Sequence, residues 1–236
     1  MTQTAFITGG SKGIGLGIAK ALLEDGWNVA FTGRNQAALD QAVTELGGEH
    51  ASRVLAVAAD VQDRDALTAA FDATRARFNS PSLVVANAGI GAFGDVSEMD
   101  PNDWDDVIGI NLTGAFNTLQ AAVQDLKQEQ GLFITIGSLA GTNFFAGGAA
   151  YNASKFGLLG FSQAAMLDLR PFGVRVSTIM PGSVSTHFNG HTPSDADAWK
   201  IQPEDIADLV RSLVRMPART LPSKIEVRPS QPGGPK

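Results

Sequence analysis

The chain has 236 residues, 44% hydrophobic and 18% charged, a composition typical of a folded globular protein and not of a disordered or fibrous one. Its 24 acidic and 18 basic residues give a net charge of −6 without any block of like charge, which argues against nucleic acid or an anionic membrane as a partner. The chain has no cysteine, which excludes disulfides, thiolate zinc sites and cysteine nucleophiles and fits a cytoplasmic location. No basic leader precedes the first apolar run, and no apolar stretch approaches about eighteen residues, so neither an export signal nor a membrane span is predicted.

Strand-like and helical patterns alternate along the chain. Short β-branched or apolar runs predict seven strands, at residues 5–8, 29–32, 54–58, 83–86, 132–136, 174–179 and 225–227. The longest predicted helices span residues 101–130 and 149–172, the first with Asp100 as its N-cap and Pro101 at its first position. The alternation predicts an α/β fold, a single doubly wound (Rossmann) domain over residues 1–228 with a seven-stranded parallel sheet between two helix layers. Residues 229–236 are rich in Pro and Gly and are predicted to form a flexible tail.

A glycine-rich turn follows the first predicted strand directly. Thr8-Gly9-Gly10-Ser11-Lys12-Gly13-Ile14-Gly15 joins this strand to the first amphipathic helix. Glycines permit left-handed backbone angles and let a pyrophosphate approach the amide groups at the positive end of a helix. A tight turn without a ligand is the simpler alternative, but the strand before it and the helix after it favour dinucleotide binding.

The end of the second predicted strand indicates which dinucleotide is bound. It runs Phe31-Thr32-Gly33-Arg34-Asn35 and offers no carboxylate for a ribose 2′-hydroxyl. Arg34 can instead bind a 2′-phosphate through two parallel hydrogen bonds, and Lys12 in the glycine turn adds a second positive charge. The two cations predict NADP rather than NAD, the alternative being that both are solvated surface residues.

The spacing Gly9-x-x-x-Gly13-x-Gly15, together with later motifs in order, resembles the short-chain dehydrogenase/reductase family. The later motifs are Asp60-Val61, Asn87-Ala88-Gly89, Asn111, Ser138, Tyr151-x-x-x-Lys155 and Pro181-Gly182-Ser-Val-Ser-Thr186. The resemblance covers residues 4–228 and has two departures. Ala86 stands where the family more often has Asn, and the end of the chain lacks the glycine-rich closing stretch of the larger fatty-acyl and steroid-type members, which weakens any transfer of their substrates.

The resemblance implies a set of cofactor contacts. Asp60 and Val61 would contact the adenine, Lys155 the nicotinamide ribose and Thr186 the carboxamide. The full set expected to bind NADP(H) is Gly9, Ser11, Lys12, Gly13, Ile14, Gly15, Arg34, Asp60, Val61, Asn87, Ala88, Gly89, Tyr151, Lys155, Pro181, Gly182, Val184 and Thr186.

Tyr151, Lys155 and Ser138 form a chemically coherent group. Carbonyl reduction adds a hydride to carbon and a proton to oxygen, and Tyr151 can supply the proton. Lys155 follows at i+4 on the same helix face, and one charge about 4 Å away is worth roughly 4 kcal/mol at an effective dielectric near 20. We therefore expect the pKa of Tyr151 to fall by roughly two units or more from about 10. Ser138 is predicted to donate a hydrogen bond to the substrate oxygen.

Asn111 completes this group by the resemblance, which implies that it holds a water relaying protons toward Lys155. Each of the four residues also has an ordinary structural explanation. Tyr151 could be a buried hydroxyl with a partner, Lys155 a solvated surface cation, Ser138 a turn residue, and Asn111 a partner for helix backbone groups.

Two further groups of residues stand out. His187 and His191, followed by Asp195 and Asp197, have a spacing like that of metal ligands, but Gly190 and Pro193 argue against the helix that would present both imidazoles, and no metal is predicted. This segment instead resembles the family's mobile lid and ends by Pro203. Several aromatic residues flank the expected cleft and predict an apolar substrate pocket, with ordinary core as the alternative: Phe93, Phe144, Phe145, Phe188 and Trp199.

The sequence thus predicts an enzyme that uses NADPH to reduce a small ketone or aldehyde, or that oxidises a secondary alcohol in reverse. By the resemblance, the two long helices would assemble a homodimer or homotetramer. A lyase, dehalogenase or epimerase with the same four residues is one alternative, and a non-catalytic NADP-sensing module is another. The complete set of four argues against sensing, because a sensor needs only the glycine turn and Arg34.

Overall fold

The computed structural model describes residues 2–231, so that residues 232–236 of the predicted tail lie outside the described residues. One sheet organises this part of the chain. Its seven strands are β1 (Thr4–Thr8), β2 (Asn28–Gly33), β3 (Val54–Ala58), β4 (Leu83–Ala86), β5 (Leu132–Ile136), β6 (Arg175–Pro181) and β7 (Lys224–Val227). All neighbours are parallel, in the order β3-β2-β1-β4-β5-β6-β7. The predicted sheet is confirmed, and every strand begins and ends within two residues of its predicted bounds.

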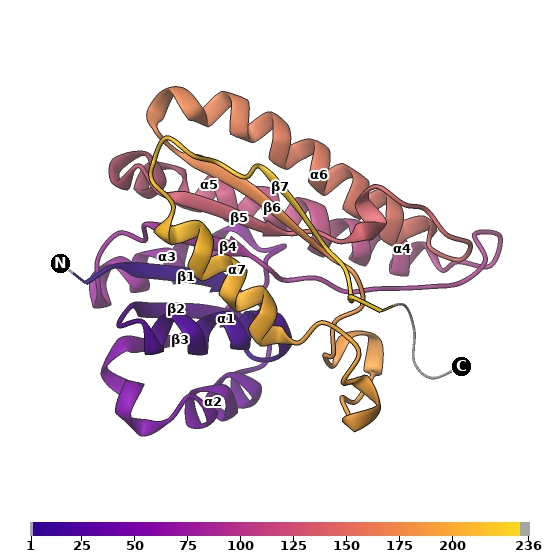
Figure 1. The fold of residues 1–236 in the computed structure, drawn as a ribbon, viewed down its shortest axis with the longest axis horizontal. Helices are drawn as coiled ribbons and strands as arrows, with labels where there is room; N and C mark the ends of the chain where they lie inside the picture. Colours follow the sequence, from indigo (N-terminus) through magenta and orange to yellow (C-terminus); the bar gives the residue numbers. More distant parts are fainter. Residues whose placement is uncertain (1, 232–236) are drawn as a thin grey trace.

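Helices cover both faces of the sheet (Figure 1). One layer contains α1 (Gly13–Glu24), α2 (Gln36–Glu45) and α7 (Pro203–Arg215), whose apolar residues share one core cluster. The opposite layer contains α3 (Arg64–Arg77), α5 (Gly114–Glu129) and α6 (Ala149–Leu169), which share a second cluster. Between the elements lie α4 (Pro101–Ile108) and the short 3-10 turns Gly48–Arg53, Leu139–Gly141, Arg170–Phe172, Phe188–Gly190 and Asp195–Asp197. No helix in residues 2–231 is both long and apolar enough to cross a bilayer.

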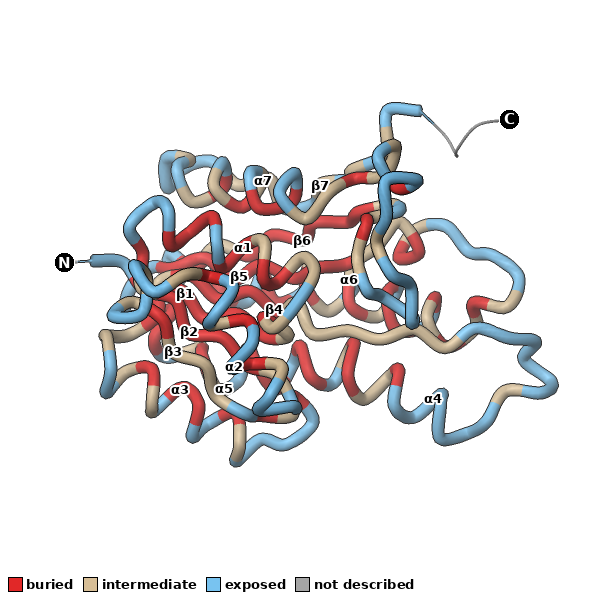
Figure 2. Tube along the Cα trace, turned by 90° about the horizontal axis from the view of Figure 1, so that it is seen from below, coloured by how far each residue is buried: buried red, intermediate tan, exposed pale blue. Residues whose placement is uncertain are grey.

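Strands β1 to β6 are largely apolar on both faces because both faces are covered, whereas the edge strand β7 exposes Lys224 and Glu226. In β1, Ala5 and Ile7 belong to the cluster of α1, whereas Phe6 points the other way and stacks on Phe71 of α3 with 3.8 Å between ring centroids. Figure 2 shows the buried strands in the interior and the exposed residues mainly on helices and loops. Alternation along the inner strands therefore supplies two cores rather than one core and one solvated face.

The site is positioned by the reversal of strand order beside β1. The crossover from β1 to β2 passes through α1 on one face, and the crossover from β3 to β4 passes through α3 on the other. The chain segments that follow β1 and β4 therefore run toward opposite edges of the sheet. A crevice forms outside the carboxyl ends of strands at such a switch point, where open α/β sheets bind ligands.

The predicted helix over residues 101–130 is divided by a π-helical turn, Gly109–Thr113, so the prediction of one uniform α-helix is wrong there. Two glycines bound this turn and lie against the segment after β3. A Cβ on Gly114 would lie 2.5 Å from Val61 Cγ2, and one on Gly109 would clash with the Gln62 side-chain oxygen. The close approach to Val61 thus requires glycine at position 114, and Asn111 lies within the π turn.

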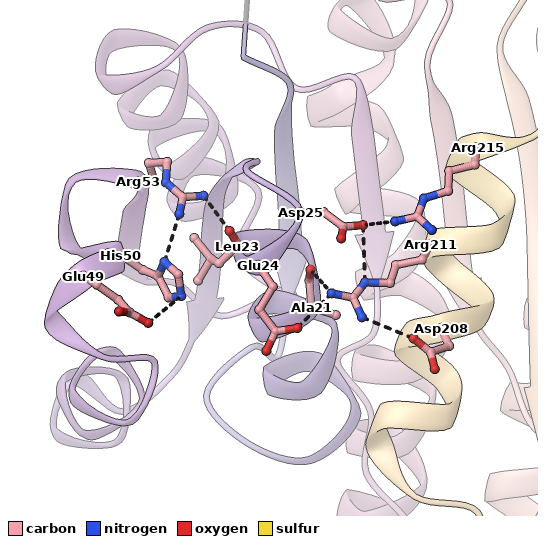
Figure 3. A network of polar contacts seen from close by, with 10 residues as sticks. All are labelled: Ala21, Leu23, Glu24, Asp25, Glu49, His50, Arg53, Asp208, Arg211 and Arg215. Carbon is pink, nitrogen blue, oxygen red and sulfur yellow. Dashed lines mark hydrogen bonds and ion pairs between the residues drawn. The ribbon is translucent and has the colours of Figure 1, made fainter.

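Helix α7 is joined to α1 by a network around Arg211, drawn in Figure 3. Arg211 donates to the Ala21 carbonyl at 2.7 Å and pairs with Glu24, Asp25 and Asp208 at 2.8, 3.3 and 3.3 Å. At the other end of α7, a Cβ on Gly17 would lie 2.9 Å from Pro203. The start of α7 thus packs against the first turns of α1, which follow the glycine turn.

Candidate active site

The turn after β1 has a backbone that glycine makes possible. Gly9 and Gly13 have φ angles of +66° and +56°, which side chains other than glycine rarely adopt. The Asn87 amide, at the end of β4, donates to the carbonyls of Thr8 and Gly9, both at 2.9 Å. A Cβ on Gly15 would clash with the Gly9 carbonyl and lie 2.6 Å from this amide. Asn87 and Gly15 therefore hold the shape of the turn that opens α1.

A cavity of about 710 Å³ runs from this turn across the carboxyl ends of the strands to Tyr151. Every residue predicted to bind the cofactor lines it except Gly15, which packs beneath the turn. The cavity also has lining residues that the sequence analysis missed, among them Thr32, Ile90, Ile136, His187 and Lys200. The positive φ angles, the close backbone packing and the length of the cavity fit a dinucleotide with its pyrophosphate at the start of α1.

The charges lining the cavity are mostly positive. Lys12, Arg34, Lys155 and Lys200 line it, and Asp60 is the one acidic residue among the described lining residues. Lys12 and Arg34 are exposed, and neither forms an ion pair with any residue between 2 and 231. Both cations therefore remain available to an anionic ligand.

Lys155 lies at the inner end of the cavity, where its ammonium is buried. Its Nζ donates to the Ile136 carbonyl at the end of β5, at 3.1 Å, and lies 5.7 Å from the centroid of the Tyr151 ring. The i+4 spacing has placed both side chains at one point, as the helical pattern predicts. Ser138, which directly precedes the turn Leu139–Gly141, accepts a hydrogen bond from the Ala140 amide at 3.1 Å, which leaves its hydroxyl proton free for another acceptor.

The prediction that the pKa of Tyr151 is lowered is wrong when the protein's own groups act on it. Burial raises the pKa of this phenol above its ordinary value, and hydrogen bonding to Ser138 opposes that rise without cancelling it. Burial also lowers the pKa of Lys155 to about 8. The cost of removing both groups from water outweighs the attraction between the ammonium and the phenolate, and helical spacing in the sequence does not reveal that cost.

Asn111 is buried and lies behind Gly89 and Ile90, which line the cavity, without lining it itself. Its side chain accepts from the Ile90 amide at 2.8 Å and donates to the Ile90 carbonyl at 2.9 Å and to Ser154 at 3.0 Å. It thereby joins the π turn to the segment after β4 and to α6. Both hydrogens of its side-chain amide are donated to protein groups, and a water-holding role for this residue stays a prediction from the family resemblance.

Asn152, the residue after Tyr151, is a positioning residue that the sequence analysis missed. Its amide donates to the carbonyls of Ala140 and Asn143 at 2.8 and 2.9 Å, and its oxygen accepts from the Phe145 amide at 3.3 Å. One side chain thus fastens the loop between Ser138 and α6 to the helix that carries Tyr151 and Lys155. In the sequence, only its position next to Tyr151 could have indicated a role for Asn152 in the site.

Aromatic side chains gather around Tyr151. Phe93 and Phe188 have ring centroids 5.4 and 5.7 Å from that of Tyr151, and Phe145 lies 6.0 Å from Phe93. Phe144 and Phe145 line a second hollow of about 430 Å³, which Ser138 and Tyr151 also line. The four phenylalanines predicted for the substrate pocket therefore lie beside the candidate catalytic residues. Trp199 lines neither hollow and stands instead beside Lys200.

The segment between β6 and α7, coloured orange in Figure 1, crosses the end of the cavity. Its two ends are joined by a parallel bridge between Val184 and Ile201. The Asp197 carboxylate pairs with His191 and Lys200, each at 2.5 Å, and these two bonds hold its pKa well below the ordinary value. Asp197 therefore anchors the segment.

The spacing that resembled a metal site brings His191 and Asp197 together but leaves out the other two side chains. His187 lines the large cavity, and Asp195 is exposed. Within residues 2–231, no three His, Asp or Glu side chains are grouped in a way that could hold a metal ion. Asp197 instead uses both of its oxygens on His191 and Lys200.

A doubly wound sheet with a glycine turn at its switch point, opening on a Tyr–Lys–Ser group, defines a nicotinamide-dependent oxidoreductase that acts on alcohol or carbonyl groups. The sequence profile of the short chain dehydrogenase family matches residues 3–197. The chain belongs to that family.

Individual relatives agree with this assignment. The chain is 34% identical over 220 residues to trans-4-hydroxycyclohexanecarboxylate dehydrogenase from Sinomonas cyclohexanicum, covering 88% of this chain and 84% of that protein. It superposes with a TM-score of 0.92 and 28% identity on an alcohol dehydrogenase from Thermococcus sibiricus complexed with 5-hydroxy-NADP, covering 99% and 100% of the two chains. A 3-oxoacyl-[acyl-carrier protein] reductase from Brucella melitensis with bound NAD gives a TM-score of 0.83 at 30% identity, covering 96% and 89%.

The raised pKa of Tyr151 can be measured directly because it is the only tyrosine in the chain. Burial disfavours the charged phenolate, so the ultraviolet titration of the folded protein is expected to have its midpoint above 10. Tyr151→Phe supplies the blank. A midpoint below 10 would show that the attraction of Lys155 outweighs desolvation.

The role of Asn152 predicts a local loss of order on its removal. Asn152→Ala leaves the carbonyls of Ala140 and Asn143 without their donor, so the free energy of unfolding is expected to fall by about 1–3 kcal/mol. Amides of residues 139–145 should exchange hydrogen faster, as measured by mass spectrometry. Gln41→Ala, which removes an exposed side chain of α2, should change stability by less than about 0.5 kcal/mol. Equal effects of both variants would refute the role of Asn152.

Proposed function

We propose that the protein is an NADPH-dependent reductase of a small ketone or aldehyde, which also oxidises the corresponding secondary alcohol in reverse. One arrangement carries the proposal. Tyr151, Ser138 and Lys155 meet at one end of a long cavity whose other residues include Arg34 and Lys12. The cavity thus offers a proton donor and a binding region for a phosphorylated cofactor in one continuous space.

The preference for NADP rests on Arg34 and Lys12. Arg34 follows β2 directly, at the place where a carboxylate would bind the free ribose hydroxyl of NAD. Structural neighbours do not decide the matter, because one holds an NADP derivative and another holds NAD. An unpaired guanidinium beside a second cation favours the extra phosphate of NADP.

The bound nicotinamide supplies the hydride that reduction requires. With a raised pKa, Tyr151 is protonated at neutral pH and can donate its proton to the carbonyl oxygen. Ser138 donates a hydrogen bond to the same oxygen, and the Lys155 ammonium, which is mainly charged at pH 7, stabilises the phenolate as it forms. Asn111 keeps the backbone around Gly89 and Ile90 in place beside Lys155.

The aromatic side chains near Tyr151 favour a substrate with an apolar body. Phe93 and Phe188 pack against the Tyr151 ring. Phe145 packs against Phe93, and Phe144 and Phe145 extend this apolar surface into the second hollow. The relative from Sinomonas cyclohexanicum is named for a ring-bearing secondary alcohol, a compound of the size that a hollow of about 430 Å³ would hold. We include such ring ketones in the substrate class.

Self-association through the two long helical segments belongs to the same proposal. Their outer faces carry exposed apolar side chains, with Trp104 in α4, Phe116 in α5, and Phe156 and Leu167 in α6. Exposed aromatic residues on adjacent helices are typical of surfaces that another protein covers. A homodimer or homotetramer would bury them.

The catalytic proposal predicts the effect of removing one hydroxyl group. Tyr151→Phe is expected to lower the rate of ketone reduction by about 10²–10⁴-fold, the usual contribution of a general acid, while NADPH still binds. Loss of NADPH absorbance over a panel of ketones and aldehydes measures the rate. Undiminished turnover in the variant would overturn the role of Tyr151. Tight NADPH binding without turnover of any compound would favour a lyase, an epimerase or a sensing module.

The cofactor proposal predicts a selective defect. Arg34→Gln is expected to raise the KM for NADPH by about 10- to 100-fold, because a charged hydrogen bond to phosphate is lost, and to leave the KM for NADH within about threefold. Lys20→Gln, which removes an exposed cation of α1 that does not line the cavity, is the matched control. If the unaltered protein used NADPH and NADH equally well, the proposed role of Arg34 in selecting NADP would be refuted.

A further inference from the structure

The chain after β7 returns to the catalytic end of the molecule. The Gly182 amide donates to the Val227 carbonyl at 2.8 Å, and a Cβ on Gly182 would lie 3.3 Å from Pro229. Residues 227–229 therefore cross the end of β6, next to the loop that lines the cavity. Arg228, between these two contacts, lines the second hollow together with Ser138 and Tyr151.

Arg228 carries a positive charge that its neighbours only partly balance. Its guanidinium pairs with Glu226 at 3.0 Å, and Lys224 lies 3.7 Å from the same carboxylate. Two cations thus share one anion on β7. A guanidinium has five N–H donors, and this side chain is 57% exposed, so it retains donors for a ligand.

Apart from the neutral amide of Asn143, the rest of the hollow is apolar or small. Leu139, Ala140, Phe144 and Phe145 form its apolar part, and no Asp or Glu of the described chain lines it. An occupant with matching chemistry has an apolar body against the phenylalanines, a carbonyl oxygen at Ser138 and Tyr151, and a negative charge at Arg228. A carboxylate suits a guanidinium because it accepts two parallel hydrogen bonds.

We propose that Arg228 is a specificity-determining residue that binds a carboxylate of the substrate. The substrate is then an oxo acid, or the hydroxy acid of the reverse reaction, in which a ring or short apolar chain separates the carboxylate from the reacting carbon. This inference rests on the proposed function for the reacting end of the substrate. The recognition of the carboxylate itself depends only on the hollow and Arg228.

A binding experiment tests the recognition apart from turnover. Cyclohexanecarboxylate and its neutral match cyclohexanecarboxamide are titrated calorimetrically into the full-length protein with NADP⁺ present. The carboxylate is expected to bind about tenfold or more tightly than the amide, and Arg228→Gln is expected to abolish that difference. Arg170→Gln, an exposed arginine after the far end of α6 and about 30 Å along that helix from Tyr151, should retain it.

Turnover supplies the second arm, with 4-oxocyclohexanecarboxylate compared with 4-methylcyclohexanone. Arg228→Gln is expected to lower kcat/KM for the oxo acid by about 10- to 100-fold, mainly through KM, and to leave kcat/KM for the neutral ketone within about twofold. Glu226→Gln, which removes the competing carboxylate, should preserve or increase the preference for the oxo acid.

The two proposals fail in different ways. A wild-type protein without a preference for carboxylate over amide, or a preference that survives Arg228→Gln, overturns the inference. An equal loss for both ketones also overturns it, because Arg228 would then act on the fold. Carboxylate binding that depends on Arg228, without turnover of either ketone, contradicts the proposed function and leaves the inference supported.

Discussion

The buried ammonium of Lys155 is the interaction on which the candidate active site depends. A charge removed from water costs free energy unless it has hydrogen-bond partners, and the Ile136 carbonyl at the end of β5 is one. Close packing beside Lys155 requires small residues. A Cβ on Gly141 would lie 2.8 Å from the Lys155 carbonyl, and a Cβ on Gly89 would lie 3.2 Å from the Asn111 side-chain oxygen. The ends of β4 and β5 and the first turns of α6 must therefore meet at one point.

The two ends of the cavity differ in chemistry because different strands supply them. The turn after β1 and the end of β2 contribute backbone amides, Lys12 and Arg34, which suit an anionic cofactor. The ends of β5, β6 and β7 contribute Ser138, Gly182 and Arg228 around an apolar hollow. Tyr151 lines both spaces, so the phenol stands where a cofactor and a substrate would meet.

Segments without long helices or strands are held by a few polar side chains. Asp197 anchors the segment over the cavity, Asn152 the loop after Ser138, and Asn87 the glycine turn. Each satisfies backbone groups or charges that the adjoining regular elements leave without partners, and such groups are costly when buried. Precise placement of the site is therefore a property of these polar contacts as much as of the sheet.

The sequence by itself determined the seven strands, the parallel doubly wound sheet, the glycine turn and the Tyr–Lys pair, because each has a local signal in hydrophobic period, glycine spacing or helical offset. Tertiary structure alone decided the π turn that contains Asn111, the loop contacts of Asn152, the raised pKa of Tyr151 and the position of Arg228 beside Ser138 and Tyr151. Burial and contacts between residues far apart in the chain govern these features. The hydrophobic period of a segment does not tell which residues from distant parts of the chain will be buried together, away from water.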